Sequence, residues 1–281
     1  MARRLISASL AIPIGIFILW LDRKEMYLIA IAVISAMAVY EILVATKYIN
    51  HRLLAVSSLL FVISIPFILN YDVGFLNTRY ISFGFIIGLF VLMLFSHARI
   101  KFAEVALVSM VSLLIPFSMS CIGFMYDQFP SHRTFTLVYV LTVTWIADSG
   151  AFFAGTFLGK HKMAPEISPK KTWEGFIGGI ITAIIFGLLL GKGYELIMTA
   201  VEGELTFKVD LLFLALFAIP CTFLGVLGDF TASLLKRECA VKDFGNIMPG
   251  HGGVMDRFDS ILFVLPFAYL IFLQYFPVVD L

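Results

Sequence analysis

Apolar residues run along the chain in long stretches, and short polar segments separate one stretch from the next. A helix needs about 20 mostly apolar residues to cross the hydrocarbon core of a bilayer. The stretches therefore predict an all-α, polytopic integral membrane protein with about nine transmembrane helices. The predicted spans are residues 5–21, 26–45, 53–70, 80–97, 105–125, 134–158, 175–191, 211–235 and 259–276.

Composition supports the membrane class. The 281 residues are 60% hydrophobic and 14% charged, whereas soluble domains carry about 25% charged residues. The net charge of +1 gives no reason to expect a nucleic-acid partner. The cysteines, Cys121, Cys221 and Cys239, lack metal-binding spacing, so we expect neither zinc nor disulfides.

The first apolar stretch follows the sequence MARR and is similar to a signal peptide. It has no convincing cleavage site and further spans follow at once, so we expect a retained first helix. If the N-terminus is cytoplasmic, fourteen of the 20 Lys and Arg residues lie on the cytoplasmic side. The positive-inside rule then predicts an N-in, C-out topology, with the polar loops 159–174 and 236–258 facing the cytoplasm. The compact loops fit a bacterial cytoplasmic membrane.

Polar residues within the spans concentrate in the second half of the chain. Ionisable residues in or near a bilayer are costly and are functional candidates by default. We therefore predict two regions: residues 1–130 as scaffold helices with a possible role in dimerisation, and residues 131–281 as the catalytic region.

The eighth predicted span carries polar residues on one face. At 3.6 residues per turn, Asp229, Ser233, Lys236 and Arg237 fall on the same stripe of the helix. A structural salt bridge at a helix end is the alternative for the two cations. Asp229 lies deeper in the apolar segment, which favours a functional role for it.

A glycine-rich segment, MPGHGG, follows that helix at residues 248–253. Glycines allow close backbone approach to a ligand and let N–H groups face an anion. The chemistry-bearing residues of this segment and its continuation are His251, Gly252, Gly253, Asp256, Arg257 and Asp259. Mg²⁺ is commonly held by one or two carboxylates together with substrate phosphates, so the segment predicts a metal-assisted phosphate site.

Two further candidates lie upstream. Asp148 sits inside the sixth span, where a hydrogen-bonded group that packs helices is the alternative to a functional carboxylate. Lys170 and Lys171 precede the seventh span and suit an anionic ligand near a helix N-terminus, although a positive-inside anchor also explains them. Either Thr172 or Ser168 can cap the helix that follows.

Other patterns are given structural interpretations. Glu41 in the second span is isolated in the sequence and faces either a neighbouring helix or water. Glycines spaced four apart, such as Gly175 and Gly179, indicate close helix packing.

The chain has neither a Walker GxxxxGK[ST] motif nor a GxSxG motif, which argues against P-loop kinases and serine hydrolases. The residues alone thus indicate a lipid-phosphate or nucleotide transferase with no identified base.

Residues 233–259, SLLKRECAVKDFGNIMPGHGGVMDRFD, closely resemble the signature of the phosphatidate cytidylyltransferases, or CDP-diacylglycerol synthases. That signature runs S-x-x-K-R, then K-D, then P-G-H-G-G-x-x-D-R-x-D. The family's D-S-G-A and S-P-K-K-T-W-E-G stretches also look matched, at residues 148–151 and 168–175. Ala232 departs from the pattern, because many members have Glu there, and Phe244 stands where a small polar residue is common.

The resemblance implies that CTP and phosphatidate react to give CDP-diacylglycerol and diphosphate at the cytoplasmic face of the membrane. It implies Mg²⁺ bound by Asp229 and Asp256, a possible K⁺ nearby, and a homodimer. On this hypothesis Lys236, Arg237 and Arg257 neutralise phosphates, Ser233 and His251 supply hydrogen bonds, and Lys170 or Lys171 reaches the lipid headgroup or the leaving diphosphate. Asp148, Gly252, Gly253 and Asp259 complete the predicted substrate-binding set.

Two alternatives remain open at this stage. One is a CTP-dependent transferase that acts on another lipid phosphate, such as an isoprenoid ether lipid. The other is an ion-coupled transporter in which Asp148, Asp229 and Asp256 form an ion path. Transport predicts carboxylates along a route through the bilayer, whereas the polar residues here cluster towards one face.

Overall fold

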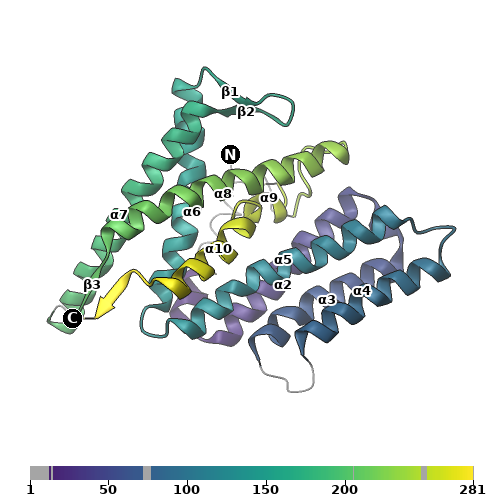
Figure 1. Cartoon of the computed structure of the whole chain (residues 1–281), viewed down its shortest axis with the longest axis horizontal. Helices are drawn as coiled ribbons and strands as arrows, with labels where there is room; N and C mark the ends of the chain where they lie inside the picture. Colours follow the sequence, from purple (N-terminus) through teal and green to yellow (C-terminus); the bar gives the residue numbers. More distant parts are fainter. Residues whose placement is uncertain (1–12, 14, 72–76, 205, 248–251, 281) are drawn as a thin grey trace. The chain divides into compact units, whose positions relative to one another are not determined.

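The structure is a computed structural model of the 281-residue chain (Figure 1). It describes residues 13, 15–71, 77–204, 206–247 and 252–280. The chain forms two compact units, each made of segments distant in sequence. The first comprises Met1–Phe124 with Lys236–Phe258, and the second comprises Met125–Leu235 with Asp259–Leu281.

Seven helices among the described residues are long and apolar enough to cross a membrane. They are α2 (Lys24–Ala45), α3 (Arg52–Asn70), α4 (Thr78–Phe95), α5 (Phe102–Gln128), α6 (Arg133–Leu158), α7 (Trp173–Glu202) and α8 (Leu211–Glu238). These helices coincide with the second to eighth predicted spans. The chain is thus a helical integral membrane protein, as its hydropathy pattern predicts.

The two ends of the chain differ from the pattern. The predicted span 259–276 contains the shorter helix α10 (Ile261–Gln274), and the four-residue helix α9 (Met255–Phe258) precedes it. At 14 residues, α10 is shorter than the roughly 20 residues that a perpendicular span needs. The predicted span 5–21 lies largely outside the described residues, although residues 15–21 are helical. The count of nine spans, the N-in topology and the functional division at residue 130 stay predictions.

Two small antiparallel sheets add to the helices. Strands β1 (Lys162–Ala164) and β2 (Ser168–Thr172) form a hairpin within the segment that the sequence indicated as a loop, residues 159–174. Strands β3 (Phe207–Val209) and β4 (Val278–Asp280) pair in the register Lys208 to Val279. Strands of three to five residues are too short to be recognised by apolar alternation in the sequence.

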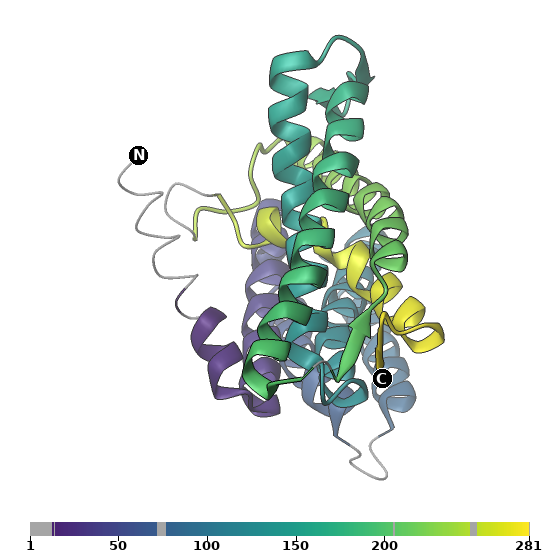
Figure 2. The same ribbon diagram turned by 90° about the vertical axis from the view of Figure 1, so that its left-hand side faces the viewer.

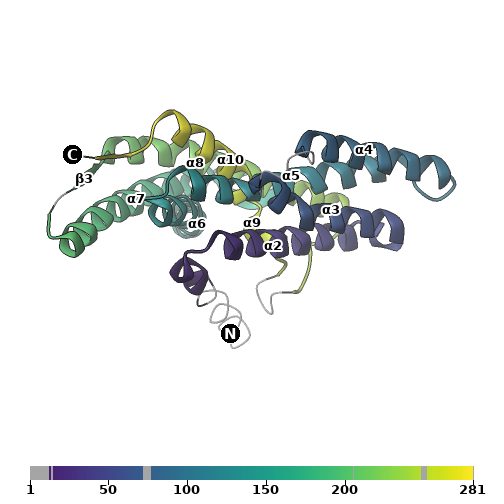
Figure 3. The same cartoon turned by 90° about the horizontal axis from the view of Figure 1, so that it is seen from below.

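In the first unit, α2 and α3 are joined through the short 3₁₀ helix η1 (Tyr48–Asn50) and lie side by side (Figures 1 and 3). Their shared core is aliphatic, with Leu28, Leu43 and Leu54 fully buried. A buried hydrogen bond of 2.6 Å between the hydroxyls of Ser58 and Ser112 links α3 to α5. Side chains buried in this way hold the helices in a fixed register.

In the second unit, α6 and α7 form a long helical hairpin, with β1 and β2 at the connection (Figure 2). Small residues bring the two helices together. A Cβ atom added to Gly179 would lie 2.9 Å from the carbonyl oxygen of Ala147, and one added to Gly175 would lie 2.7 Å from that of Ala151. The predicted close packing at these glycines is therefore confirmed. Tyr139 also donates a 2.8 Å hydrogen bond to the carbonyl of Leu214, which ties α6 to α8.

Candidate functional site

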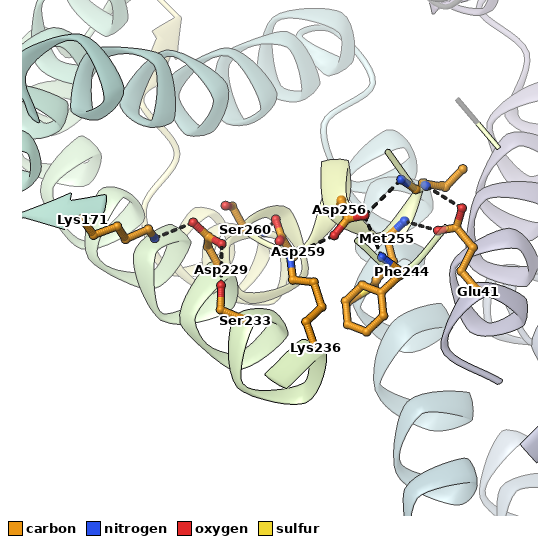
Figure 4. A network of polar contacts seen from close by, with 12 residues as sticks. Glu41, Lys171, Asp229, Ser233, Lys236, Phe244, Met255, Asp256, Asp259 and Ser260 are labelled. Carbon is orange, nitrogen blue, oxygen red and sulfur yellow. Dashed lines mark hydrogen bonds and ion pairs between the residues drawn. The ribbon is translucent and has the colours of Figure 1, made fainter. Parts of the chain in front are cut away.

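Asp256 lies in α9, within the polar segment of the first unit formed by residues 236–258, and three donors hydrogen-bond its carboxylate (Figure 4). Its Oδ1 atom accepts a hydrogen bond from the Lys236 ammonium at 2.9 Å. Its Oδ2 atom accepts from the backbone N–H groups of Phe244 and Gly253, both at 3.0 Å. The side chains of Lys236 and Asp256 are only 13% and 8% exposed, so the ion pair is largely shielded from water.

Glu41 projects from α2 into the same polar segment, which the sequence did not indicate. Its Oε1 atom accepts from the N–H of Val254 at 3.0 Å, and its Oε2 atom accepts from the N–H of Met255 at 2.9 Å (Figure 4). The residue is 2% exposed. Of the two environments that the sequence left open, the structure therefore shows the neighbouring helix, because Met255 is the first residue of α9. The partners of Glu41 lie 213 and 214 residues further along the chain.

The glycines of this segment permit a tight backbone path. Gly252 has a φ of +83°, a conformation that side chains rarely adopt. A Cβ atom added to Gly245 would lie 2.5 Å from Oε1 of Glu41, and one added to Gly253 would overlap Oε2 of the same carboxylate. The predicted hydrogen-bonding residue His251 lies outside the described residues, so its role stays a prediction.

In the second unit, Asp229 on α8 pairs with Lys171, the last but one residue of β2 (Figure 4). The Lys171 ammonium lies 2.5 Å from Oδ2 of Asp229 and 4.6 Å from the centre of the Phe230 ring. Ser233 donates a long hydrogen bond of 3.4 Å to Oδ1 of the same carboxylate. The Asp229 and Ser233 stripe predicted on the helix is thus present. Lys171 was predicted as a substrate-binding cation, but its pairing with Asp229 was not predicted.

Asp148 on α6 lies near this pair. It accepts a 3.1 Å hydrogen bond from the hydroxyl of Ser260 and interacts electrostatically with both Asp229 and Lys171. The side chain of Asp259 turns back to accept from the N–H of Ser260 at 2.8 Å. Asp148, Asp229 and Lys171 therefore form one electrostatic group within the second unit, with Ser260 bridging towards Asp259.

The hairpin residues divide into buried and exposed members. Thr172 is the N-cap of α7, and its Oγ1 atom accepts from the N–H of Gly175 at 3.1 Å, which confirms the cap predicted at Thr172 or Ser168. Glu174 accepts hydrogen bonds from the backbone of Lys160 and His161, which closes the other arm of the hairpin. Lys170 is exposed on β2, so its side chain is accessible to a ligand.

The remaining predicted cations are exposed. Arg237 lies at the end of α8 and Arg257 within α9.

Cys239, which follows α8, is half-buried. Burial raises the pKa of its thiol, and the negative charge of the nearby Glu238 carboxylate adds to this effect. A thiol with a raised pKa is a poor nucleophile at neutral pH.

The donor set is compatible with Mg²⁺. Among the residues that the structure describes, no group of three or more His, Cys, Asp or Glu side chains is placed to hold a metal ion. Mg²⁺ does not require such a cage, because it commonly takes one or two carboxylates with substrate phosphates and water. The side chain of Asp229 is 31% exposed, and each carboxylate oxygen has two lone pairs, so Asp229 and Asp256 both retain acceptor capacity beside their lysines.

Sequence comparison with known proteins supports the resemblance to the phosphatidate cytidylyltransferases. A phosphatidate cytidylyltransferase of Bacillus subtilis (strain 168) is 44% identical over 135 residues, which are 48% of this chain and 46% of that protein. A phosphatidate cytidylyltransferase of Haemophilus influenzae is 38% identical over 159 residues, 56% of this chain and 53% of that protein. A third, of Staphylococcus saprophyticus, is 41% identical over 154 residues, 54% of this chain and 55% of that protein.

The chain spans about half the length of the curated relatives it matches. A wider match comes from the sequence model of a whole family, described as the cytidylyltransferase family, which covers residues 2–276. That match includes most of both units and every candidate residue discussed above. The chain belongs to the cytidylyltransferase family.

Proposed function

We propose that the protein is a phosphatidate cytidylyltransferase, which converts CTP and phosphatidate into CDP-diacylglycerol and diphosphate. The observation that carries the proposal is the family match over residues 2–276, joined to relatives that are themselves named phosphatidate cytidylyltransferase. The paired carboxylates and lysines of the two units are the groups that such a reaction needs.

The proposed reaction needs no strong general base. A phosphate oxygen of phosphatidate, already ionised, forms a bond to the α-phosphorus of CTP while the bond from that phosphorus to the bridging oxygen of the β-phosphate breaks. Diphosphate leaves and carries the electron pair of the broken bond. Transfer at phosphorus depends chiefly on positioning and charge neutralisation, which agrees with a site rich in cations and poor in titratable nucleophiles.

The residues of the chain take the following proposed roles. Lys236 and Lys171 each hold a carboxylate in place through an ion pair, and each retains ammonium hydrogens for a phosphate oxygen. The exposed cations Lys170, Arg237 and Arg257 attract and neutralise the triphosphate and the lipid headgroup. Ser233 and the predicted His251 supply hydrogen bonds.

We further propose that the reaction depends on Mg²⁺, with Asp229 and Asp256 as the candidate protein ligands and K⁺ as a possible second ion. A divalent cation at a phosphoryl-transfer site supplies charge neutralisation of the phosphate oxygens. The support for this proposal is chemical: both residues are carboxylates, each already has a cationic partner, and each keeps acceptor capacity.

The substrate proposal is tested with purified full-length protein in lipid nanodiscs that contain Mg²⁺ and CTP. Phosphatidate, an isoprenoid ether-lipid phosphate and diacylglycerol are supplied in turn, and lipid-linked cytidine is measured. Product from phosphatidate alone supports the proposal. Product from the ether-lipid phosphate alone assigns a different lipid substrate to the same chemistry, and no product from any lipid contradicts the proposal.

We propose a bacterial inner-membrane location, with the site facing the cytoplasm, and a homodimer. The excess of Lys and Arg on the predicted cytoplasmic side supports the orientation. A cysteine introduced at exposed Lys162 should react with an impermeant maleimide in inside-out vesicles, above the labelling of wild type, and not in right-side-out vesicles.

Sedimentation in detergent tests the proposed homodimer and should give a two-chain mass. A one-chain mass at all concentrations contradicts the dimer.

A further inference from the structure

Glu41 is a carboxylate buried in an apolar helix of the first unit, and it has a specific set of partners. It is 2% exposed on α2, and its two oxygens accept from the consecutive N–H groups of Val254 and Met255 at 3.0 and 2.9 Å. Burying a carboxylate is costly unless hydrogen bonds replace its hydration. The two backbone donors supply that replacement.

The partners of Glu41 lead directly to Asp256. Three successive N–H groups, those of Gly253, Val254 and Met255, are shared between two carboxylates: the first donates to Asp256 and the other two to Glu41 (Figure 4). The first N–H groups of a helix have no partner within it. Glu41 therefore supplies an acceptor for the N–H of Met255, which is the first residue of α9 and precedes Asp256 in the sequence.

The backbone around Glu41 is shaped to admit its carboxylate. A Cβ at Gly245 would come within 2.5 Å of Oε1, and a Cβ at Gly253 would overlap Oε2. Phe244, next to Gly245, donates its N–H to Asp256. Both loop segments that hydrogen-bond Asp256 thus also pack directly against Glu41, so movement of Glu41 would move the donors that orient Asp256.

We propose that Glu41 is a positioning residue that holds the Gly253–Met255 backbone and thereby fixes the orientation of the Asp256 carboxylate. The consequence for activity rests on the proposed function, in which Asp256 belongs to the catalytic machinery. The anchoring of the backbone rests on geometry alone. The two claims therefore have separate measurements.

Hydrogen exchange of the full-length protein in detergent micelles tests the anchoring. Glu41→Gln keeps the shape but replaces one acceptor oxygen with an NH₂ group, which cannot accept from an N–H. A hydrogen bond to a charged acceptor stabilises enough that its loss should accelerate exchange at Val254 and Met255 about tenfold or more. Ser112→Ala, which removes the buried Ser58–Ser112 bond of the same unit, is the control and should leave these amides unchanged.

Exchange in Glu41→Gln within twofold of wild type would overturn the anchoring. If this variant fails to fold, Gly245→Ala crowds Oε1 of the same carboxylate and should give the same acceleration. Glu41→Asp keeps both oxygens at a shorter reach and should restore part of the protection. No protection difference in any of these variants refutes the inference.

Kinetics of the same variants test the consequence. With CTP and phosphatidate, Glu41→Gln should lower kcat at least tenfold and raise the Mg²⁺ concentration for half-maximal rate, while the KM for phosphatidate stays within twofold; Glu41→Asp should recover part of kcat. Faster exchange with unchanged kcat and Mg²⁺ dependence refutes the positioning role. If wild type itself has no activity, the proposed function fails and the exchange data still decide the anchoring.

Discussion

The ion pair between Lys236 and Asp256 should stabilise the fold, and its two partners should be strongly coupled. Lys236→Met removes the charge but keeps an unbranched side chain that can pack near the Phe244 ring, which lies 5.4 Å from the ammonium. Asp256→Asn removes the negative charge at nearly constant shape. The double variant removes both charges together.

The magnitudes follow from burial and hydrogen bonding. The side chains are 13% and 8% exposed, so the pair resembles a buried ion pair, for which loss of one partner costs about 3–5 kcal/mol. After Lys236→Met, the Asp256 carboxylate keeps its two backbone donors, so we expect about 3 kcal/mol. Asp256→Asn leaves the ammonium without its counter-ion, so we expect about 4 kcal/mol. The double variant should lose about 2–3 kcal/mol less than the sum, because the residues are in contact.

Equilibrium unfolding in mixed micelles, followed by far-UV circular dichroism and checked for reversibility, gives the free energy of unfolding for all four proteins. A coupling of about 2–3 kcal/mol is the expected result. Losses below about 0.5 kcal/mol for every variant, as for a solvent-exposed pair, or strict additivity would refute the description of this pair as buried and coupled.

Three further predictions concern packing, pH and metal. Gly179→Ala should destabilise the α6–α7 hairpin by about 1–3 kcal/mol through overpacking, whereas Gly193→Ala on the same helix, with open space around it, should stabilise by about 0.5–1 kcal/mol; equal effects in thermal unfolding would contradict the packing. A hydrogen bond of 2.5 Å from the Tyr275 hydroxyl lowers the pKa of Asp210 from its ordinary 3.8, so this contact stabilises above that value and its contribution is lost as pH falls below about 4. The melting temperature of Asp210→Asn should therefore fall less than that of wild type between pH 5 and pH 3, and parallel curves would argue against the contact. Removal of Mg²⁺ by EDTA should abolish CDP-diacylglycerol formation and Mg²⁺ addition should restore it, whereas activity that persists in EDTA would rule out the metal requirement.

Sequence reasoning succeeded where a single helix carries the signal. The span of α8 and its polar stripe follow from hydropathy and the 3.6-residue period, and Thr172 was a candidate cap because of its residue type and place. Each of these features depends on neighbours within a few residues. Local physics was sufficient to predict them.

Features that depend on tertiary contact were missed. No other charged residue lies within five positions of Glu41 in the sequence to suggest a partner, and its oxygens accept from N–H groups more than 200 residues away. The pairing of Lys171 with Asp229 depends on the β1–β2 hairpin, which the three-residue strand β1 and the polar, proline-containing strand β2 do not reveal in the sequence. The sequence signal for Glu41 is the free-energy cost of placing a lone carboxylate within an apolar helix. Such a carboxylate needs a partner elsewhere in the fold.

The most direct test of the account uses CTP labelled at either its α- or its γ-phosphorus, with phosphatidate, Mg²⁺ and purified full-length protein. The account predicts that the α-label enters the lipid as CDP-diacylglycerol and the γ-label leaves as diphosphate, and that folded Asp256→Asn forms neither product while Ser112→Ala forms both. No α-label in lipid with wild type, or full activity in folded Asp256→Asn, would contradict it.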